Sequence, residues 1–220
     1  MGKIAIFDFD GTIVNTITDV ALAFNQALKE NGYPEHPMEA FDGFVGGNLE
    51  TVVARMLPED CIKDKNIDSV KFAYRRIYSE SQKENTKPYD GIVELLEKLK
   101  KNGWKIAVNS NKGQQLLDEL VAELFPKGYF DSVVGYLESR PSKPDACGVE
   151  LIYADCCETA PIAIYVGDGM SDVRTAINAG IPCVFVNWGQ GKLEEAYQEN
   201  VICVETIEEL ENVLLDWKDK

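Results

Sequence analysis

Two carboxylates stand one residue apart near the N-terminus, where a strongly apolar segment ends. The stretch KIAIFDFDGTIV places Asp8 and Asp10 on either side of Phe9 and follows them with Gly11 and Thr12. Like charges at this separation repel each other. An ordinary polar turn at a strand end would be one explanation of the pair. A site whose chemistry needs both acids, for cation binding or proton transfer, is the other.

Further polar groups follow apolar segments later in the chain. They are Ser110 and Asn111 at the end of WKIAVNSN, Lys143 in SRPSKPD, and Asp168 and Asp172 in VGDGMSD. In a parallel sheet the carboxyl ends of the strands share one edge, which is where ligands bind. We therefore expect these groups to converge with the first pair of acids.

A divalent cation would relieve the repulsion among the converging acids. Mg²⁺ prefers oxygen ligands in near-octahedral geometry and keeps waters or a phosphate in its shell. The carboxylates of Asp8 and Asp168, with the main-chain carbonyl of Asp10, form a suitable set. Asp172 lies one helical turn after Asp168, where it would hold a metal-bound water or orient the lysine. The alternative is that GDGMSD is a turn that caps a helix through Ser171 or Asp168.

The elements that must position these residues alternate between strands and helices. Together with the N-terminal strand, short apolar segments predict strands at 104–111, 131–136, 162–168, 182–188 and 201–205. Helical spacing appears between them at 92–102, 113–125, 146–155, 172–179, 192–199 and 207–217. Strands that are apolar on both faces and alternate with helices indicate a doubly wound, Rossmann-like parallel sheet of the α/β class.

One connection is far longer than a crossover helix requires. After the first strand, residues 15–85 show helical spacing and little strand character. We therefore predict an inserted all-helical cap domain at 15–85, and an α/β core made of 1–14 and 86–220. Hinges at 14–16 and 84–88 would let the cap close over the cleft.

Charge and hydropathy exclude two classes of partner. The chain has 37 acidic and 22 basic residues, a formal net charge of −15, and no basic stripe, which disfavours nucleic-acid binding. No apolar run approaches the roughly 20 residues that span a bilayer, and the N-terminal apolar run is too short for a signal peptide. We expect a cytoplasmic protein that contacts neither nucleic acid nor membrane. An anionic substrate would need local positive charge.

Cysteine and histidine chemistry is not supported. The six cysteines contain no C-x-x-C pair, and Cys156 is followed directly by Cys157. Several lie in apolar runs such as PCVFV and VICVE, so we expect reduced thiols in the core. The single histidine, His36, lies in the turn-like segment YPEHPME and is expected to be a loop residue.

The motifs together resemble those of a known family. DFDGT, Ser110 after an apolar strand, Lys143 in KPD, and GDGMSD are similar in order and spacing to the four signature motifs of the haloacid dehalogenase superfamily. The helical insertion resembles the cap of its phosphoglycolate phosphatase-like branch. KPYDGIVELLEKLKKNGWKIAVNSNK and FVNWGQG are also similar to segments of that branch, and the resemblance covers essentially the whole chain.

The resemblance implies a two-step phosphoryl transfer. Asp8 would attack phosphorus to form an aspartyl phosphate, and Asp10 would protonate the leaving alkoxide and then activate water. Mg²⁺, Lys143, the Ser110 hydroxyl and backbone amides would stabilise charge on the phosphoryl oxygens. The phosphate-binding set implied in this way is Asp8, Phe9, Asp10, Gly11, Thr12, Ser110, Asn111 and Lys143.

The cap contributes a candidate substrate loop. FVGGNLE resembles the loop that screens substrates in this branch, with Gly46, Gly47 and Asn48 at its centre. The loop itself brings no Arg or Lys to hold a substrate carboxylate. Nearby arginines would either supply that charge or be solvated helix residues; they are Arg55, Arg75 and Arg76.

The leading function hypothesis is a Mg²⁺-dependent phosphatase for a small phosphorylated metabolite, with phosphoglycolate as the best single substrate. A β-phosphoglucomutase-like phosphomutase is the alternative enzyme, in which the aspartyl phosphate would be returned to a sugar. A non-catalytic binding protein on the same fold is the third reading. The sequence does not indicate an oligomeric state.

Overall fold

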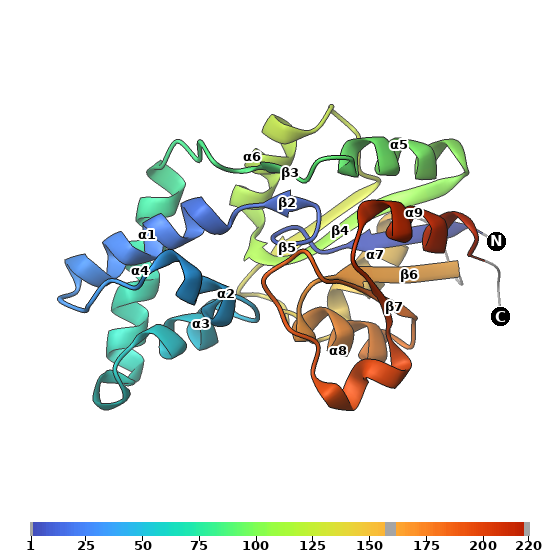
Figure 1. Ribbon diagram of the computed structural model, residues 1–220. Coiled ribbons are helices and arrows are strands. Elements are labelled where there is room, and N and C mark those ends of the chain that lie inside the picture. The colour runs from blue at the N-terminus through green and yellow to red at the C-terminus, as the bar shows by residue number, and fades with distance from the viewer. Residues whose placement is uncertain (1, 157–161, 218–220) are drawn as a thin grey trace.

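The computed structural model describes residues 2–156 and 162–217. At its centre lies a six-stranded sheet in the order β5-β4-β1-β6-β7-β8, in which every neighbouring pair is parallel (Figure 1). The strands are β1 (Lys3–Phe7), β4 (Trp104–Gly113), β5 (Ser132–Tyr136), β6 (Ile162–Gly167), β7 (Cys183–Val186) and β8 (Ile202–Val204). The doubly wound parallel sheet predicted from the sequence is confirmed.

Both faces of the sheet are buried, because strand residues alternate between two apolar layers. In β1, Ala5 and Phe7 belong to one buried cluster, and Ile4 and Ile6 belong to the other. The first cluster is completed by α5 (Ile92–Lys101), α6 (Gln114–Leu124) and α9 (Ile207–Leu215). The second is completed by α7 (Cys147–Asp155) and α8 (Met170–Ala179). Burial on both sides explains why the strands read as continuous apolar runs.

The helix predicted at 192–199 is confirmed only in part. The structure has only a short 3₁₀ helix there, η3 (Glu195–Asn200). Leu193 and Tyr197 pack against the second apolar layer. Ala196 is the one other apolar residue at 192–199, so the segment lacks the apolar face that would hold a full α-helix against the sheet.

A second hydrophobic core, built from residues between Val20 and Tyr78, lies away from the sheet. Figure 1 shows its helices gathered to one side of the molecule. They are α1 (Ile17–Glu30), α2 (Phe41–Phe44), α3 (Leu49–Met56) and α4 (Asp64–Glu80), with 3₁₀ turns η1 (Met38–Ala40) and η2 (Glu59–Cys61). The Phe24 and Tyr74 rings stack across α1 and α4 with centroids 3.8 Å apart. The inserted helical unit is therefore present, and we propose 15–85 as the bounds of this cap.

The chain crosses between core and cap twice, and the two crossings lie side by side. β2 (Val14–Asn15) pairs antiparallel with β3 (Lys87–Pro88) to form a two-stranded ribbon. This ribbon was not predicted, because two-residue strands leave no periodicity in a sequence. It overlaps the predicted hinges at 14–16 and 84–88. Motion at these hinges stays a prediction.

A buried carboxylate ties the two crossings together. Asp19, in the first turn of α1, accepts hydrogen bonds from the main-chain N of Asn85 at 3.0 Å and from its Nδ2 at 2.9 Å. The Thr86 hydroxyl donates a third at 2.7 Å. Asp19 is 7% exposed, so these donors replace the water that the carboxylate would otherwise bind.

The described cysteines divide between core and surface. Cys156 and Cys183 are buried, as expected of core thiols, whereas Cys203 is exposed. Cys203 lies on β8, which is an edge strand, and so an apolar run there does not imply burial on both faces. Cys157 lies outside the described residues. His36 is a loop residue, as predicted.

None of the helices in the described ranges is long and apolar enough to cross a membrane. The longest of the helices named above, α4, has 17 residues and one face on the cap core.

Replacing Asp19 with alanine is expected to destabilise the protein by about 2 to 3 kcal/mol, because three donors at the junction, among them the buried Thr86 hydroxyl, lose a charged acceptor. Urea unfolding followed by circular dichroism measures this change. Asp68→Ala is the matched control, since the Asp68 side chain is 72% exposed and its ion pair with Lys71 contributes within about 0.5 kcal/mol. Equal losses in the two variants would contradict the role assigned to Asp19.

Candidate active site

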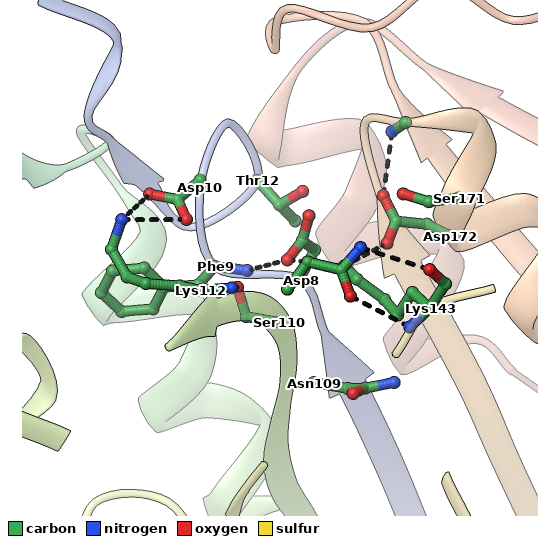
Figure 2. A network of polar contacts seen from close by, with 12 residues as sticks. Asp8, Phe9, Asp10, Thr12, Asn109, Ser110, Lys112, Lys143, Ser171 and Asp172 are labelled. Atoms are coloured by element: carbon green, nitrogen blue, oxygen red, sulfur yellow. Dashed lines mark hydrogen bonds and ion pairs between the residues drawn. The ribbon is translucent and has the colours of Figure 1, made fainter. Parts of the chain in front are cut away.

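The predicted polar residues meet at the carboxyl edge of the three central strands. Asp8 follows β1, Ser110 lies near the end of β4, and Asp168 follows β6. Because β4, β1 and β6 are adjacent and parallel, their ends bring these side chains to one place. Lys143 enters from the loop between β5 and α7, and Asp172 from the first turn of α8 (Figure 2).

Three carboxylates form the centre of this cluster. One oxygen from each of Asp8, Asp168 and Asp172 lies within 4.8 Å of the others. All three residues are at most 9% exposed. The Lys143 ammonium, also buried, lies 2.8 Å from Asp8 Oδ1 and 2.6 Å from Asp172 Oδ1. The sequence-based expectation that Asp172 orients the lysine matches this contact.

The electrostatics of the cluster show a shortage of positive charge. Burial raises the pKa of Asp8 to about 7, and the charge of Asp172 acts in the same direction while Lys143 opposes both. Burial, and then the charge of Asp8, raise the pKa of Asp168 to about 6. Burial also raises the pKa of Asp172, against the effect of Lys143. In Lys143, burial lowers the pKa, but the two carboxylates outweigh it and the net shift is upward.

The donor set fits a divalent cation. The three carboxylates have one ammonium among them, which contacts Asp8 and Asp172, so the ionised cluster carries two uncompensated negative charges. A dication at this position would balance them and would lower the raised carboxyl pKa values. Oxygen donors are those that Mg²⁺ prefers.

Asp168 is held in place by the segment that follows β7 and by the first loop. Its Oδ2 accepts hydrogen bonds from the main-chain N of Gln190 at 2.9 Å and of Gly191 at 3.4 Å. Its Oδ1 accepts one from the Thr12 hydroxyl at 3.0 Å. Gly11 has φ +80°, and a Cβ there would lie 2.4 Å from Asp168 Oδ2. Thr12 and Gly11, predicted to bind phosphate, therefore also position this carboxylate.

The start of α8 is capped by a residue other than the two that the sequence suggested. The N-cap residue is Gly169, rather than Ser171 or Asp168. Asp172 Oδ2 accepts a hydrogen bond from the Gly169 main-chain N at 2.9 Å, while its Oδ1 faces Lys143. One carboxylate thus closes the helix start and holds the lysine.

The Asp10 side chain turns away from the three clustered carboxylates. Its Oδ1 accepts hydrogen bonds from the Thr16 hydroxyl at 2.7 Å and from Lys112 Nζ at 2.9 Å. Lys112 Nζ also lies 3.2 Å from Asp10 Oδ2. Asp10 would therefore join a metal site through its main-chain carbonyl, as the sequence suggested, and its side chain stays separate from the metal ligands.

The other residues predicted to bind phosphate lie around Asp8. The Phe9 main-chain N donates to Asp8 Oδ1 at 2.6 Å. Ser110 lines the cavity, and its Oγ accepts a hydrogen bond from the Lys112 main-chain N at 3.2 Å. The side chain of Asn111 is used structurally, because it exchanges two hydrogen bonds with the main chain of Lys143.

The cluster opens into a cavity of about 860 Å³ that is lined by both core and cap. The cap loop contributes Gly46, Gly47 and Asn48 to its lining. Asn48 caps α3 by accepting a hydrogen bond from the Thr51 main-chain N at 2.9 Å, and the Arg55 guanidinium binds the carbonyls of the loop. The loop is therefore held by its own contacts, and Arg55 serves the loop instead of the cavity.

Of the other two arginines, Arg75 is exposed and lines the cavity, whereas Arg76 pairs with Glu30 and Glu80 on the surface. Arg76 is thus a surface residue of the cap. Arg75 is thus an exposed cation at the cavity.

Sequence reasoning did not assign a role to several residues of the site. Lys112 and Tyr78 face each other across core and cap, with Lys112 Nζ 4.8 Å from the centroid of the ring. Gln190 supports Asp168 through its main chain. The sequence did point to two of these residues, because both lie in segments that resemble the family. Lys112 follows Ser110 and Asn111 in NSNK, and Gln190 lies in FVNWGQG. Nothing in the local sequence pairs Tyr78 with the site.

Comparisons with known proteins agree with this geometry. The family model of the haloacid dehalogenase-like hydrolases matches residues 5–186. A phosphoglycolate phosphatase from Aquifex aeolicus is 34% identical over 191 residues, which cover 87% of this chain and 87% of that protein. A phosphoglycolate phosphatase from Nitrosospira multiformis is 30% identical over 203 residues, covering 89% of this chain and 88% of that protein.

A solved structure shows the same fold over nearly the whole chain. It is that of a candidate phosphoglycolate phosphatase from Lactobacillus delbrueckii subsp. bulgaricus, with a TM-score of 0.89 and 27% identity, covering 97% of this chain and 98% of that one. The chain therefore belongs to the haloacid dehalogenase-like hydrolase family and is a phosphatase, an enzyme that hydrolyses phosphoric monoesters.

Proposed function

We propose that this protein is a Mg²⁺-dependent phosphatase that hydrolyses a small phosphate monoester through an aspartyl-phosphate intermediate, with phosphoglycolate as the best single substrate. The proposal rests mainly on one observation. Asp8, Asp168 and Asp172 are buried within 4.8 Å of one another, with a single ammonium between two of them, at the base of a cavity. That arrangement suits a group that must bind a cation and a phosphoryl group together.

Asp8 is the nucleophile of the proposed reaction. Its carboxylate oxygen forms a bond to phosphorus while the bond from phosphorus to the ester oxygen breaks. Lys143, 2.8 Å from Asp8, and the Ser110 hydroxyl are placed to stabilise the charge on the phosphoryl oxygens. The main-chain amide that follows Asp8 would act in the same way.

Asp10 is the acid and then the base. It gives a proton to the leaving alkoxide, and it later takes one from the water that hydrolyses the aspartyl phosphate. In the structure both Asp10 oxygens are engaged by Lys112, and one of them also by Thr16. The side chain must therefore leave these partners when a substrate is bound.

The proposed metal ligands are the Asp8 and Asp168 carboxylates and the main-chain carbonyl of Asp10. Asp172 would act on the site mainly by orienting Lys143, which it contacts at 2.6 Å. When bound, Mg²⁺ would supply positive charge that neutralises the phosphoryl oxygens and holds the Asp8 carboxylate ionised.

The proposal also names a specific substrate. The relatives named phosphoglycolate phosphatase support phosphoglycolate, and a cavity closed by a cap suits a small phosphorylated metabolite. A cytoplasmic location stays a prediction from the sequence. The phosphomutase and the non-catalytic binding protein are outcomes that the experiments below separate.

Asp8→Asn is expected to lower kcat for p-nitrophenyl phosphate by about a thousandfold or more, because an amide cannot form the acyl phosphate. Asp216→Asn, at an exposed acid after α9, is the control and should keep wild-type turnover. Rapid quench and mass spectrometry of the wild type should find the phosphoryl group on the peptide that contains Asp8. Metal-dependent turnover that survives in Asp8→Asn would contradict the mechanism.

Removing divalent metal with EDTA should abolish hydrolysis, and added Mg²⁺ should restore it. In Asp168→Asn the Mg²⁺ concentration for half-maximal activity should rise about tenfold or more, because one charged ligand is lost. Titration of activity against Mg²⁺ in both proteins gives this ratio. Full turnover in EDTA would refute the cation role of the cluster.

A screen of metabolite phosphate esters, with released phosphate as the readout, tests the substrate. The expected result is the highest kcat/KM on phosphoglycolate among small esters. Transfer of phosphate to a sugar without net release would favour the phosphomutase. Absence of turnover on every ester, with Mg²⁺ present, would favour the binding protein.

A further inference from the structure

We propose that Lys112 and the Tyr78 hydroxyl form an anion-binding subsite that holds the carboxylate of the leaving group. This inference rests on the proposed function and adds the recognition of the leaving group. It concerns the side of the cavity away from the metal cluster, where Lys112 contacts the proposed acid Asp10.

Lys112 is a buried cation on the wall of the active-site cavity. Its side chain is 6% exposed, and its Nζ is held 2.9 and 3.2 Å from the two oxygens of Asp10. Figure 2 shows Lys112 and Lys143 on opposite sides of Asp8, with Asp10 next to Lys112. A phosphoryl group at Asp8 and Lys143 would therefore direct its ester oxygen toward Asp10 and the rest of the substrate toward Lys112.

Tyr78 supplies a donor that has no partner in the structure. The residue is fully buried on α4, lines the same cavity and lies beside the Lys112 ammonium. Its hydroxyl makes no hydrogen bond to any described residue. A buried polar group without a partner is costly, and a ligand oxygen at this position would satisfy it. An ammonium beside a phenol is a donor pair suited to a carboxylate.

Lys112 is itself paired with Asp10, and the other cations that line the cavity are either paired with other acids or exposed. Lys143 is shared by two carboxylates of the cluster. Lys71 pairs with Asp68 on the surface, and Arg75 is exposed. The chain as a whole has a net charge of −15, which disfavours anions at long range. A buried ammonium is therefore the strongest attraction that the leaving-group side offers to a carboxylate.

Binding of a carboxylate to Lys112 would also change the position of the Asp10 side chain. In the structure the Asp10 side chain is turned toward Lys112 and Thr16. A substrate carboxylate would compete for the ammonium and let Asp10 turn toward the ester oxygen. A neutral leaving group cannot make this exchange. The enzyme would then discriminate between substrates through the position of the catalytic acid as well as through their binding affinity.

The test compares two esters of equal size, 2-phosphoglycolate and its uncharged amide, 2-phosphoglycolamide. In wild type, kcat/KM should be higher for the carboxylate. In Lys112→Gln, the ratio of the two kcat/KM values should fall about 10- to 100-fold, the loss of one charge-assisted contact. Lys112→Arg, which keeps the charge, should retain part of the ratio, and Tyr78→Phe should lower it several-fold.

Arg75→Gln is the matched control, because it removes the exposed cation of the same cavity. Its ratio should equal that of wild type. An unchanged ratio in Lys112→Gln would overturn the proposal, and so would a fall that occurs only in Arg75→Gln. Circular dichroism of each variant excludes a loss of folding as the cause.

Calorimetry tests ligand binding at the subsite independently of the phosphatase reaction. With Mg²⁺ present, 3-phosphonopropionate should bind wild type about tenfold or more tightly than propylphosphonate, and Lys112→Gln should remove this difference. These compounds cannot be hydrolysed, so the result does not depend on turnover. If no ester were hydrolysed but the difference in affinity held, the subsite would stand without the proposed reaction. Equal affinities in wild type would refute the subsite itself.

Discussion

Mutual repulsion among three buried carboxylates is the constraint on which the rest of this structure depends. Asp8, Asp168 and Asp172 are placed within 4.8 Å of one another, and one lysine supplies the only nearby ammonium in the described cluster. A fold does not gain stability from such a group, since burial and like charge both raise the pKa values of these acids. The cluster is understandable as a site prepared for positive charge that arrives with a ligand.

The parallel sheet is what makes this concentration of acids possible. Its central strands end side by side, so that short loops deliver side chains from distant parts of the chain to one edge. The loops are supported by main-chain donors, as in the hydrogen bonds from Gln190 and Gly191 to Asp168. Close approach leaves no room for a side chain at Gly11. Rigid placement of charged groups is the form of catalysis that phosphoryl transfer mainly requires.

Core and cap contribute different residues to the site. The core holds the acids, the lysine and the hydroxyl, whereas the cap lines the cavity with its loop and with α4. Lys112 and Tyr78 stand at the boundary, one from each unit. The crossings are joined by a small ribbon and by the buried carboxylate of Asp19. The proposed subsite for the leaving group therefore lies where core and cap meet.

The amino-acid sequence was enough to predict the fold class, the inserted helices and the convergence of Asp8, Ser110 and Asp168. Apolar runs that alternate with helical patterns allow few architectures, and parallel strands bring their carboxyl ends together. The partners of each side chain, in contrast, became visible only in the folded protein. The contact of Lys112 with Tyr78, and the turn of Asp10 away from the acids, join residues with no local pattern in common. Such contacts depend on how separate elements pack, and sequence periodicity carries no information about that.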